Sequence, residues 1–265
     1  MPMQRHSPDH LDVAATSAAP RHISIYVFVA FVGLALFWLP HVARADDLNW
    51  ETDVTYSVDV DNGFLHVESE LVLSNKKPNT QSGNTITQFF FDGIELQIPE
   101  SVTNVSITTN GQDLDFSFDA LEGEESEGFK TVAVEFARNL FFNQSTTILI
   151  EFDLAGEDPR SDTPFRINPA YVTFGAFSWG DPDQTTMRIV LPSTFDIEIL
   201  GGSYASSSSK GLVVYTIDQF DNPDSGFVYI QARNDDVLTN SLASTEDYGV
   251  VVRAWPGDII WETRN

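Results

Sequence analysis

Oxygen-bearing side chains crowd into one short stretch of the chain. Four of them precede Gly226: Asp218, Asp221, Asn222 and Asp224. Carboxylate and amide oxygens are the ligands that a hard cation such as Ca²⁺ prefers. The stretch therefore predicts a calcium site, although it lacks the bidentate glutamate that closes an EF-hand loop. A plain turn between two strands is the alternative, and both interpretations stay open.

Aromatic side chains offer a second kind of site. Trp179 stands two residues before Asp181, and Tyr171 and Tyr204 lie on either side of this segment. Aromatic rings can stack on a sugar, so Trp179, Asp181 and Tyr171 are the candidate ligand-binding residues. The alternative is that these rings pack between sheets as part of the core.

Histidine limits the catalytic chemistry that the chain can perform. Four of its five histidines lie within the first 45 residues, and only His66 follows them. A His-Glu-x-x-His zinc motif does not occur in the sequence. A serine triad would have to use His66, which stands beside Glu68 on the polar face of a predicted strand, and the sequence has no Gly-x-Ser-x-Gly elbow. With no cysteine there is no thiol nucleophile, so we assign no catalytic residue and no cofactor other than the predicted calcium.

Charge is strongly one-sided. The 265 residues include 14 lysines and arginines against 39 aspartates and glutamates, for a formal net charge of −25. Such a surface repels phosphate backbones, so we expect no nucleic-acid partner. The main interpretation is a solvated surface outside the cell, and the second is calcium binding or adaptation to salt.

The first 45 residues have the pattern of an export leader. The run from Ile23 to Leu39 carries no charge, follows Arg21, and precedes the small-x-small sequence Ala43, Arg44, Ala45. This pattern predicts a signal peptide that is cleaved after Ala45. An uncleaved N-terminal anchor is the alternative, because the apolar run can just span a thin bilayer. Either way we expect the rest of the chain to be extracytoplasmic, secreted or at the bacterial cell envelope, and to meet the membrane only through the leader.

Hydrophobic residues recur at every second position along most of the remaining chain, which is the period of half-buried strands. Strands are predicted at residues 54–60, 65–73, 86–98, 105–107, 114–118, 132–136, 148–154, 195–199, 212–217, 227–231 and 248–254. With Tyr171 to Leu191 predicted as a hairpin, this makes about a dozen strands. The pattern predicts an all-β antiparallel sandwich over residues 46–254.

Turn and loop chemistry adds local detail. The sequence Asp61-Asn62-Gly63 predicts a tight turn, and residues 180–183 predict the tip of the 171–191 hairpin. Residues 74–84 are predicted as a polar loop. Three adjacent phenylalanines, Phe89 to Phe91, predict a strand that is covered on both faces, and one short helix is expected near Asp235 to Ser241.

Three segments carry a family resemblance. They are Tyr56-x-Val58-x-Val60, the predicted strand from Leu65 to Asn75 with its following Pro78, and residues 179–202, WGDPDQTTMRIVLPSTFDIEILGG. Together they resemble the N-terminal β-domain of zinc aminopeptidases of the M1 (gluzincin) type and of related secreted bacterial proteins. The resemblance implies a saddle-like domain that packs against a catalytic domain and walls its substrate cleft. The zinc motif and the Gly-x-Met-Glu-Asn motif of that family belong to the following domain, so zinc is expected only there and no catalytic residue is transferred.

The sequence, with this resemblance, therefore predicts an exported, non-catalytic β-sandwich module that serves as the accessory N-terminal domain of a metallopeptidase-like protein. Its expected partner is a protein or peptide, such as a catalytic domain. Residues 255–265, WPGDIIWETRN, are expected to be a linker or the truncated entry to a further domain, because they lack a polar tail. A free-standing cell-envelope module that binds glycan or protein is the alternative, and an independent hydrolase that uses a carboxylate pair comes third.

Overall fold

The structure is a computed structural model that describes residues 47–120, 128–157, 165–222, 225–237, 239–244, 249–255 and 258–261. The predicted leader, residues 1–45, lies outside the described residues. All described residues belong to one compact unit, Val42–Asn265. No helix that they form is long and apolar enough to cross a membrane.

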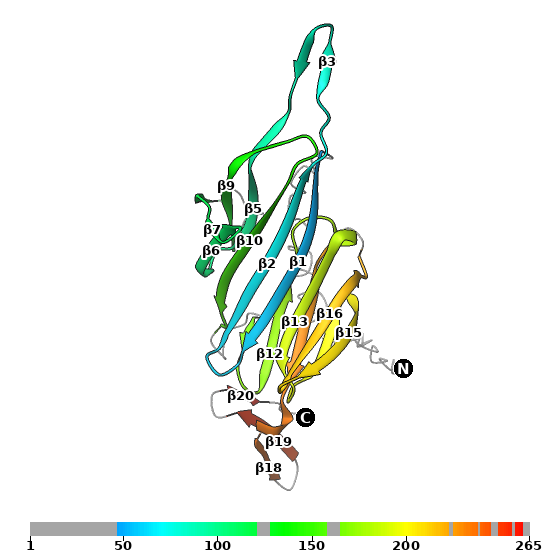
Figure 1. Cartoon of the computed structure of the whole chain (residues 1–265). Coiled ribbons are helices and arrows are strands. Elements are labelled where there is room, and N and C mark those ends of the chain that lie inside the picture. Colours follow the sequence, from blue (N-terminus) through cyan, green and yellow to red (C-terminus); the bar gives the residue numbers. More distant parts are fainter. Residues whose placement is uncertain are drawn as a thin grey trace, which may run out of the picture. The chain divides into compact units, whose positions relative to one another are not determined.

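An eight-stranded sheet with strand order β15-β16-β13-β1-β2-β10-β6-β7 is the largest sheet in the described chain (Figure 1). Its strands are β1 (Leu48–Asp59), β2 (Phe64–Asn75), β6 (Thr103–Thr109), β7 (Gln112–Asp113), β10 (Ser145–Ala155), β13 (Thr185–Pro192), β15 (Gly202–Ser209) and β16 (Leu212–Phe220). Every neighbouring pair in this sheet is antiparallel except β1 and β13, which are parallel. The predicted antiparallel arrangement is therefore confirmed with this one exception.

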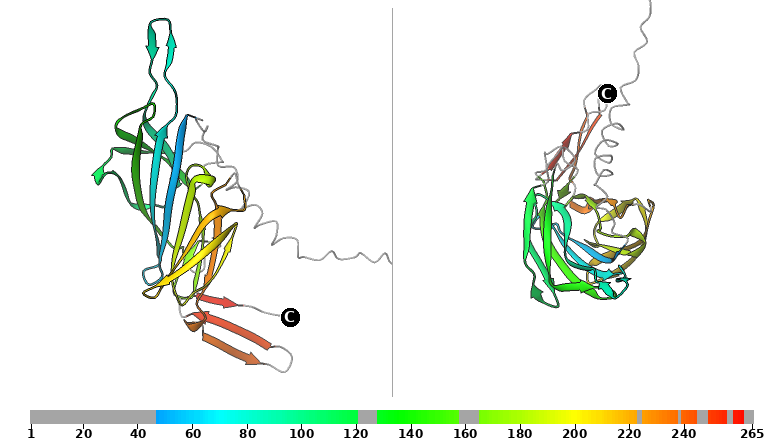
Figure 2. Two further views of the ribbon diagram at one scale, coloured as in Figure 1. Left: turned by 45° about the vertical axis from the view of Figure 1, so that its right-hand side comes forward. Right: turned by 90° about the horizontal axis from the view of Figure 1, so that it is seen from above.

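Two smaller sheets pack against the same face of the large one. The first contains β11 (Arg166–Ile167), β12 (Tyr171–Ala176), β17 (Val228–Arg233) and β14 (Asp196–Leu200), and the second contains β5 (Phe90–Pro99), β9 (Phe129–Phe141) and β8 (Phe116–Ala120). The ring of Tyr56 on β1 lies 5.9 Å from the ring of Phe174 on β12. The amide of Asn75 at the end of β2 bonds the backbone of Leu140 on β9. Figure 2 shows the resulting layers in two further views, which confirm the predicted all-β sandwich.

The core is one connected cluster of buried side chains from all three sheets. Alternation along the strands creates it: on β2 the side chains of Leu65, Val67 and Leu71 are fully buried, whereas His66 and Glu68 point to the other face. Each buried aliphatic side chain contributes roughly 1.5–3 kcal/mol. Because a one-residue slip would expose the whole apolar set, this alternation fixes which polar side chains share the outer face.

Two further groups of strands complete the described chain. The first is a hairpin of β3 (Thr80–Ser82) and β4 (Thr85–Thr87), which can be found in Figure 1 by the label β3. The second is a three-stranded sheet of β18 (Thr239–Ser244), β19 (Gly249–Trp255) and β20 (Asp258–Trp261). The described residues thus form 20 strands rather than about a dozen. The loop predicted at 74–84 is wrong in part, because it contains the end of β2 and all of β3. The helix expected near Asp235 to Ser241 is a short 3-10 helix, η3 (Asp235–Val237), followed by β18.

The hairpin predicted from Tyr171 to Leu191 is wrong. β12 pairs with β11 and β17, whereas β13 pairs with β1 and β16, so the two strands belong to different sheets. The connection includes the 3-10 helix η2 (Pro182–Gln184). It also includes Phe177 and Trp179, whose rings pack edge to face 5.5 Å apart between the sheets. Burying two large rings outweighs the turn preference of the sequence, and the chain crosses from one layer to the other instead of folding back.

The strand predicted to be covered on both faces is also wrong. The apolar run starts in β4, where Ile86 is exposed, and continues in β5, where the Phe90 ring is 47% exposed. Phe90 lies opposite Phe141 of β9, with ring centroids 5.6 Å apart. The phenylalanines pair across two strands, so one face of this small sheet presents aromatic rings to the surface.

Tyr56 supplies a test of the contact between β1 and the connection after β12. Its buried hydroxyl donates to the carbonyl oxygen of Phe177 at 2.5 Å and accepts from the Phe177 backbone N–H at 2.9 Å. Burial raises the pKa of the phenol well above its ordinary value, and the hydrogen bond with Phe177 lowers it only in part. The unfolded chain therefore loses this proton at a lower pH than the folded protein does.

We expect the buried phenol to stabilise the protein fully below about pH 10 and progressively less as the pH rises above that value. In Tyr56→Phe, two partly buried Phe177 backbone groups lose a partner, which should cost about 1–3 kcal/mol at pH 7. Above about pH 10 the free energy of unfolding of this variant should fall less steeply with pH than that of the wild type. Urea unfolding at pH 7 to 11 measures both effects, and equal pH slopes for the two proteins would contradict the assignment.

Candidate functional site

Acidic side chains and the one histidine of the described chain gather on the outer face of the large sheet. Strands β2 and β10 pair antiparallel, with His66 opposite Asp153 and Glu68 opposite Glu151. The inward neighbours of these residues, such as Phe152, are buried in the core, so the polar residues must face outward. Residues 87 positions apart in sequence thus become direct neighbours.

Three of these side chains could share one ion. A ring nitrogen of His66 and one carboxylate oxygen each of Glu68 and Glu151 all lie within 4.8 Å of one another. His66 and Glu151 are half-buried, and Glu68 is exposed. Within the described part of the chain this is the one group of three or more such ligands.

A fourth side chain orients the histidine. Asp153 Oδ1 lies 2.7 Å from His66 Nδ1, and Asn104 Nδ2 donates to the other oxygen of Asp153 at 2.7 Å. Burial of the Asp153 carboxyl would raise its pKa, but the hydrogen bonds from Asn104 and His66 and the charge of His66 lower it overall. The carboxylate is therefore ionised at neutral pH and holds the imidazole in one orientation.

The local backbone supports this arrangement. The pairing of β6 with β10 shifts register between Glu151 and Asp153, which marks a bulge at the cluster. Asn104 adopts a positive φ of 53°, a conformation that asparagine tolerates better than most residues. Bulges re-aim side chains, and here the irregular segment carries the amide that fixes Asp153.

Ser57 lies on the opposite side of the histidine. It pairs with His66 across β1 and β2, so Ser57, His66 and Asp153 form a row across three strands. In the described structure no hydrogen bond joins Ser57 to His66. The row therefore lacks the contact between nucleophile and base on which a serine triad depends.

The three candidate ligand-binding residues have separate structural surroundings. Trp179 is half-buried, donates its indole N–H to the carbonyl oxygen of Gln97 at 2.9 Å, and packs edge to face on Phe152 at 6.4 Å. Asp181 caps η2 by accepting from a backbone N–H of that helix. Tyr171 begins β12 opposite Arg233 of β17. Trp179 thus lies at the contact between sheets, which is the arrangement expected of the core alternative.

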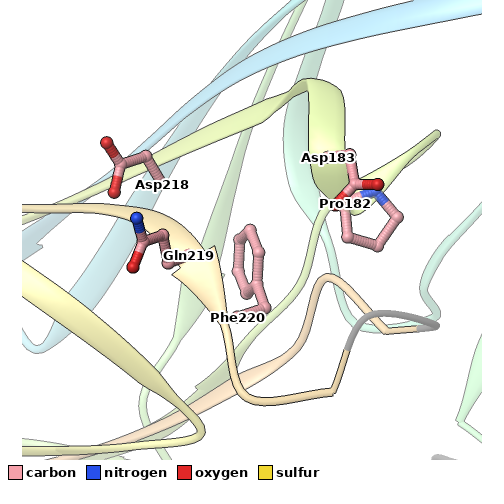
Figure 3. A pocket seen from close by; sticks show the side chains of 5 residues that line it. All are labelled: Pro182, Asp183, Asp218, Gln219 and Phe220. Atoms are coloured by element: carbon pink, nitrogen blue, oxygen red, sulfur yellow. The ribbon is translucent and has the colours of Figure 1, made fainter.

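The residues predicted to hold calcium follow β16 into a loop. Asp218 is exposed on β16, the backbone of Asp221 donates to Gly201, and the backbone of Asn222 accepts from Ser225. Asp224 lies outside the described residues. A shallow hollow of about 190 Å³ adjoins this strand and is lined by Pro182, Asp183, Asp218, Gln219 and Phe220 (Figure 3). It is smaller than the roughly 300–1,000 Å³ of a typical small-molecule pocket.

Exposed apolar side chains form a second surface of interest. Two of them, Phe90 on β5 and Phe141 on β9, lie opposite each other with their ring centroids 5.6 Å apart. Their exposed fractions are 47% and 36%. We call these two residues the aromatic patch. A lysine lies near it, since Lys77 Nζ is 4.9 Å from the ring centroid of Phe89, the residue before Phe90.

Comparisons with known proteins give partial structural matches. No protein-family model matches the sequence, and no curated protein matches it. Among solved structures, the chain is similar to an M1 zinc metallopeptidase variant of Deinococcus radiodurans bound to a Tyr-Ser-Ala substrate, with 15% identity and a TM-score of 0.43. It is also similar to the M1 zinc metallopeptidase of the same organism, with 14% identity and a TM-score of 0.37. Each match covers 78% of this chain and 47% of the solved chain, so the chain spans about half the length of these enzymes.

Proposed function

We propose that this chain is an exported, non-catalytic β-sandwich module that serves as the accessory N-terminal domain of a metallopeptidase-like protein. One observation carries the proposal. The first two segments are close in sequence and the third begins only at Trp179, yet they contain the end of β1, the strand β2 and the strand β13, which are consecutive strands at the centre of the large sheet. Most of the resemblance therefore falls on neighbouring strands rather than on scattered positions.

The proposed contact surface is the aromatic patch. Clustered exposed apolar side chains rimmed by polar residues mark protein interaction sites. Phe90 and Phe141 form one apolar surface, because they lie opposite each other on adjacent strands. The partner we propose is the catalytic domain, either in the same polypeptide or as a separate chain. In this role the module positions that domain and takes no part in the chemistry.

The first experiment identifies the partner. The protein is isolated from the culture of its own organism after export, and its peptides and those of co-purifying chains are mapped by mass spectrometry. We expect the mature N-terminus to follow Ala45 and a His-Glu-x-x-His sequence to occur in the same or a co-purifying chain. Recovery of the protein with no such sequence would count against the accessory role.

The second experiment tests the surface with matched variants. The double variant Phe90→Ser/Phe141→Ser should weaken association with that catalytic domain roughly tenfold or more, because buried aromatic anchors dominate interface energetics. Tyr204→Ser/Leu212→Ser is the control, since these residues are about equally exposed, at 46% and 44%, but lie on β15 and β16. Equal weakening by both pairs would contradict the proposed surface.

The glycan-binding alternative has its own discriminating outcome. Tyr204 is exposed and packs edge to face on Tyr215 at 5.6 Å, so it offers an accessible ring on the outermost strands of the large sheet. If the exported protein is retained on a polysaccharide and Tyr204→Ser abolishes the retention, a binding module would replace the accessory domain as the better proposal.

A further inference from the structure

We propose that His66, Glu68 and Glu151 bind one divalent transition-metal ion of the Zn²⁺ type on the outer face of the large sheet, with Asp153 as the carboxylate that orients His66. This site is independent of the proposed accessory function. It also differs in place from the calcium loop predicted around Asp218.

The spacing of the ligand atoms suits a single ion. Two ligand atoms bound to one tetrahedral zinc ion lie about 3.4 Å apart, given metal–ligand bonds of about 2.0–2.2 Å. One ring nitrogen of His66 and one carboxylate oxygen each of Glu68 and Glu151 all lie within 4.8 Å of one another. Because glutamate side chains have several rotatable bonds, we expect rotations of Glu68 and Glu151 to close this difference. Three protein ligands leave the remaining position for water.

The histidine is oriented as a metal ligand requires. With Nδ1 donating to Asp153 across 2.7 Å, Nε2 carries the lone pair that can bind a cation. A metal-binding histidine almost always donates its other ring N–H to a carboxylate, a carbonyl or water in this way. Asp153 is itself held by Asn104, so the second layer of the site is complete without the ion.

The two glutamates supply an electrostatic reason for a cation. Glu68 and Glu151 occupy directly opposed positions on neighbouring strands. Like charges in this position destabilise a sheet. Bound between them, a divalent cation turns this repulsion into attraction.

The mixed donor set selects the class of ion. Ca²⁺ takes six to eight oxygen ligands, and Mg²⁺ also prefers oxygen and retains several waters. An imidazole together with carboxylates suits first-row transition ions such as Zn²⁺. The imidazole of His66 is therefore the part of the site that should exclude calcium.

The test is calorimetric titration of the exported protein with ZnCl₂. The protein carries no polyhistidine tag, and CaCl₂ and MgCl₂ are titrated in parallel. We expect one Zn²⁺ per chain and no comparable binding of the other two ions. Asp153→Asn should weaken zinc binding roughly 10- to 100-fold. His66→Gln and Glu151→Gln should abolish saturable binding.

The control is Glu70→Gln. Glu70 is exposed on the same face of β2, two residues beyond Glu68, and lies outside the group of three ligands. This variant removes the same charge, so it should bind zinc as the wild type does. His66→Gln should keep the circular dichroism spectrum of the wild type, which shows that it is folded, and should lose the zinc-induced rise in melting temperature that the wild type shows.

Three outcomes would overturn the proposal. They are the absence of saturable zinc binding, equal weakening by Glu70→Gln and Glu68→Gln, and zinc binding that survives His66→Gln. The second would mean that zinc is attracted only by the general negative charge of the surface.

Discussion

Replacing Trp179 by alanine is expected to lower the free energy of unfolding by about 3–5 kcal/mol. The indole packs on Phe152 of the large sheet and on Phe177, and its N–H bonds the carbonyl oxygen of Gln97 on β5. The substitution removes all these contacts at once and leaves both a cavity and an unpaired carbonyl oxygen. Chemical unfolding followed by circular dichroism measures the change.

Two further variants make this result interpretable. Trp179→Phe keeps an aromatic ring at this position and loses the hydrogen bond to Gln97 and part of the ring packing, so it should cost less than the alanine variant. Tyr204→Ala removes an exposed ring and should change stability by about 0.5 kcal/mol or less. Wild-type stability in Trp179→Ala would show that the indole does not join the sheets, and would make a role in ligand binding the better interpretation. Loss of binding in that variant is informative only where the protein remains folded.

Replacing Asn75 by alanine should destabilise the protein by about 2–4 kcal/mol. The side chain is fully buried at the end of β2. Its amide donates to the carbonyl oxygen of Leu140 at 2.8 Å and, more weakly, to that of Phe89 at 3.5 Å, and its oxygen accepts from Lys77 N–H at 2.8 Å. The bond to Leu140 is buried, so the substitution should leave the carbonyl oxygen of Leu140 without a partner and its desolvation uncompensated.

Asn49→Ala is the matched control for this prediction. Asn49 makes two side-chain hydrogen bonds, both with Gln184 at an exposed position. Water replaces them on substitution, so the expected loss is about 0.5 kcal/mol or less. Equal urea midpoints for Asn75→Ala and Asn49→Ala would rule out a special role of the buried amide in joining β2 to β9.

Sequence periodicity predicts the local parts of this fold well. The turn at Asp61-Asn62-Gly63 does join β1 to β2, with Asp59 accepting from the Asn62 backbone N–H and Gly63 at a positive φ of 72°. Turn preferences act over a few residues, and here nothing distant opposes them. The same reasoning fails between Tyr171 and Leu191, because Phe177 and Trp179 gain more from burial between sheets than the chain gains from a local turn.

The cluster around His66 shows what hydrophobic periodicity cannot predict, which is the pairing of strands. The alternation along residues 148–154 already indicates that Glu151 and Asp153 point away from the core, and the alternation along 65–73 indicates the same for His66 and Glu68. The sequence contains no signal that β2 and β10 are neighbours or that His66 stands opposite Asp153. Strand pairing is a long-range property, so this cluster of side chains could not be predicted until the register was known.

The parallel pairing of β1 with β13 also sets the order in which the molecule can be completed. Asp53 and Arg188, which form an ion pair across these strands, are 135 residues apart in sequence. Until residues 185–192 have been made, β1 has one open edge, and the centre of the sheet stays incomplete. Pairing of strands that lie so far apart in sequence is slow. In a chain built in this way, the central sheet closes only after most of the polypeptide has been made.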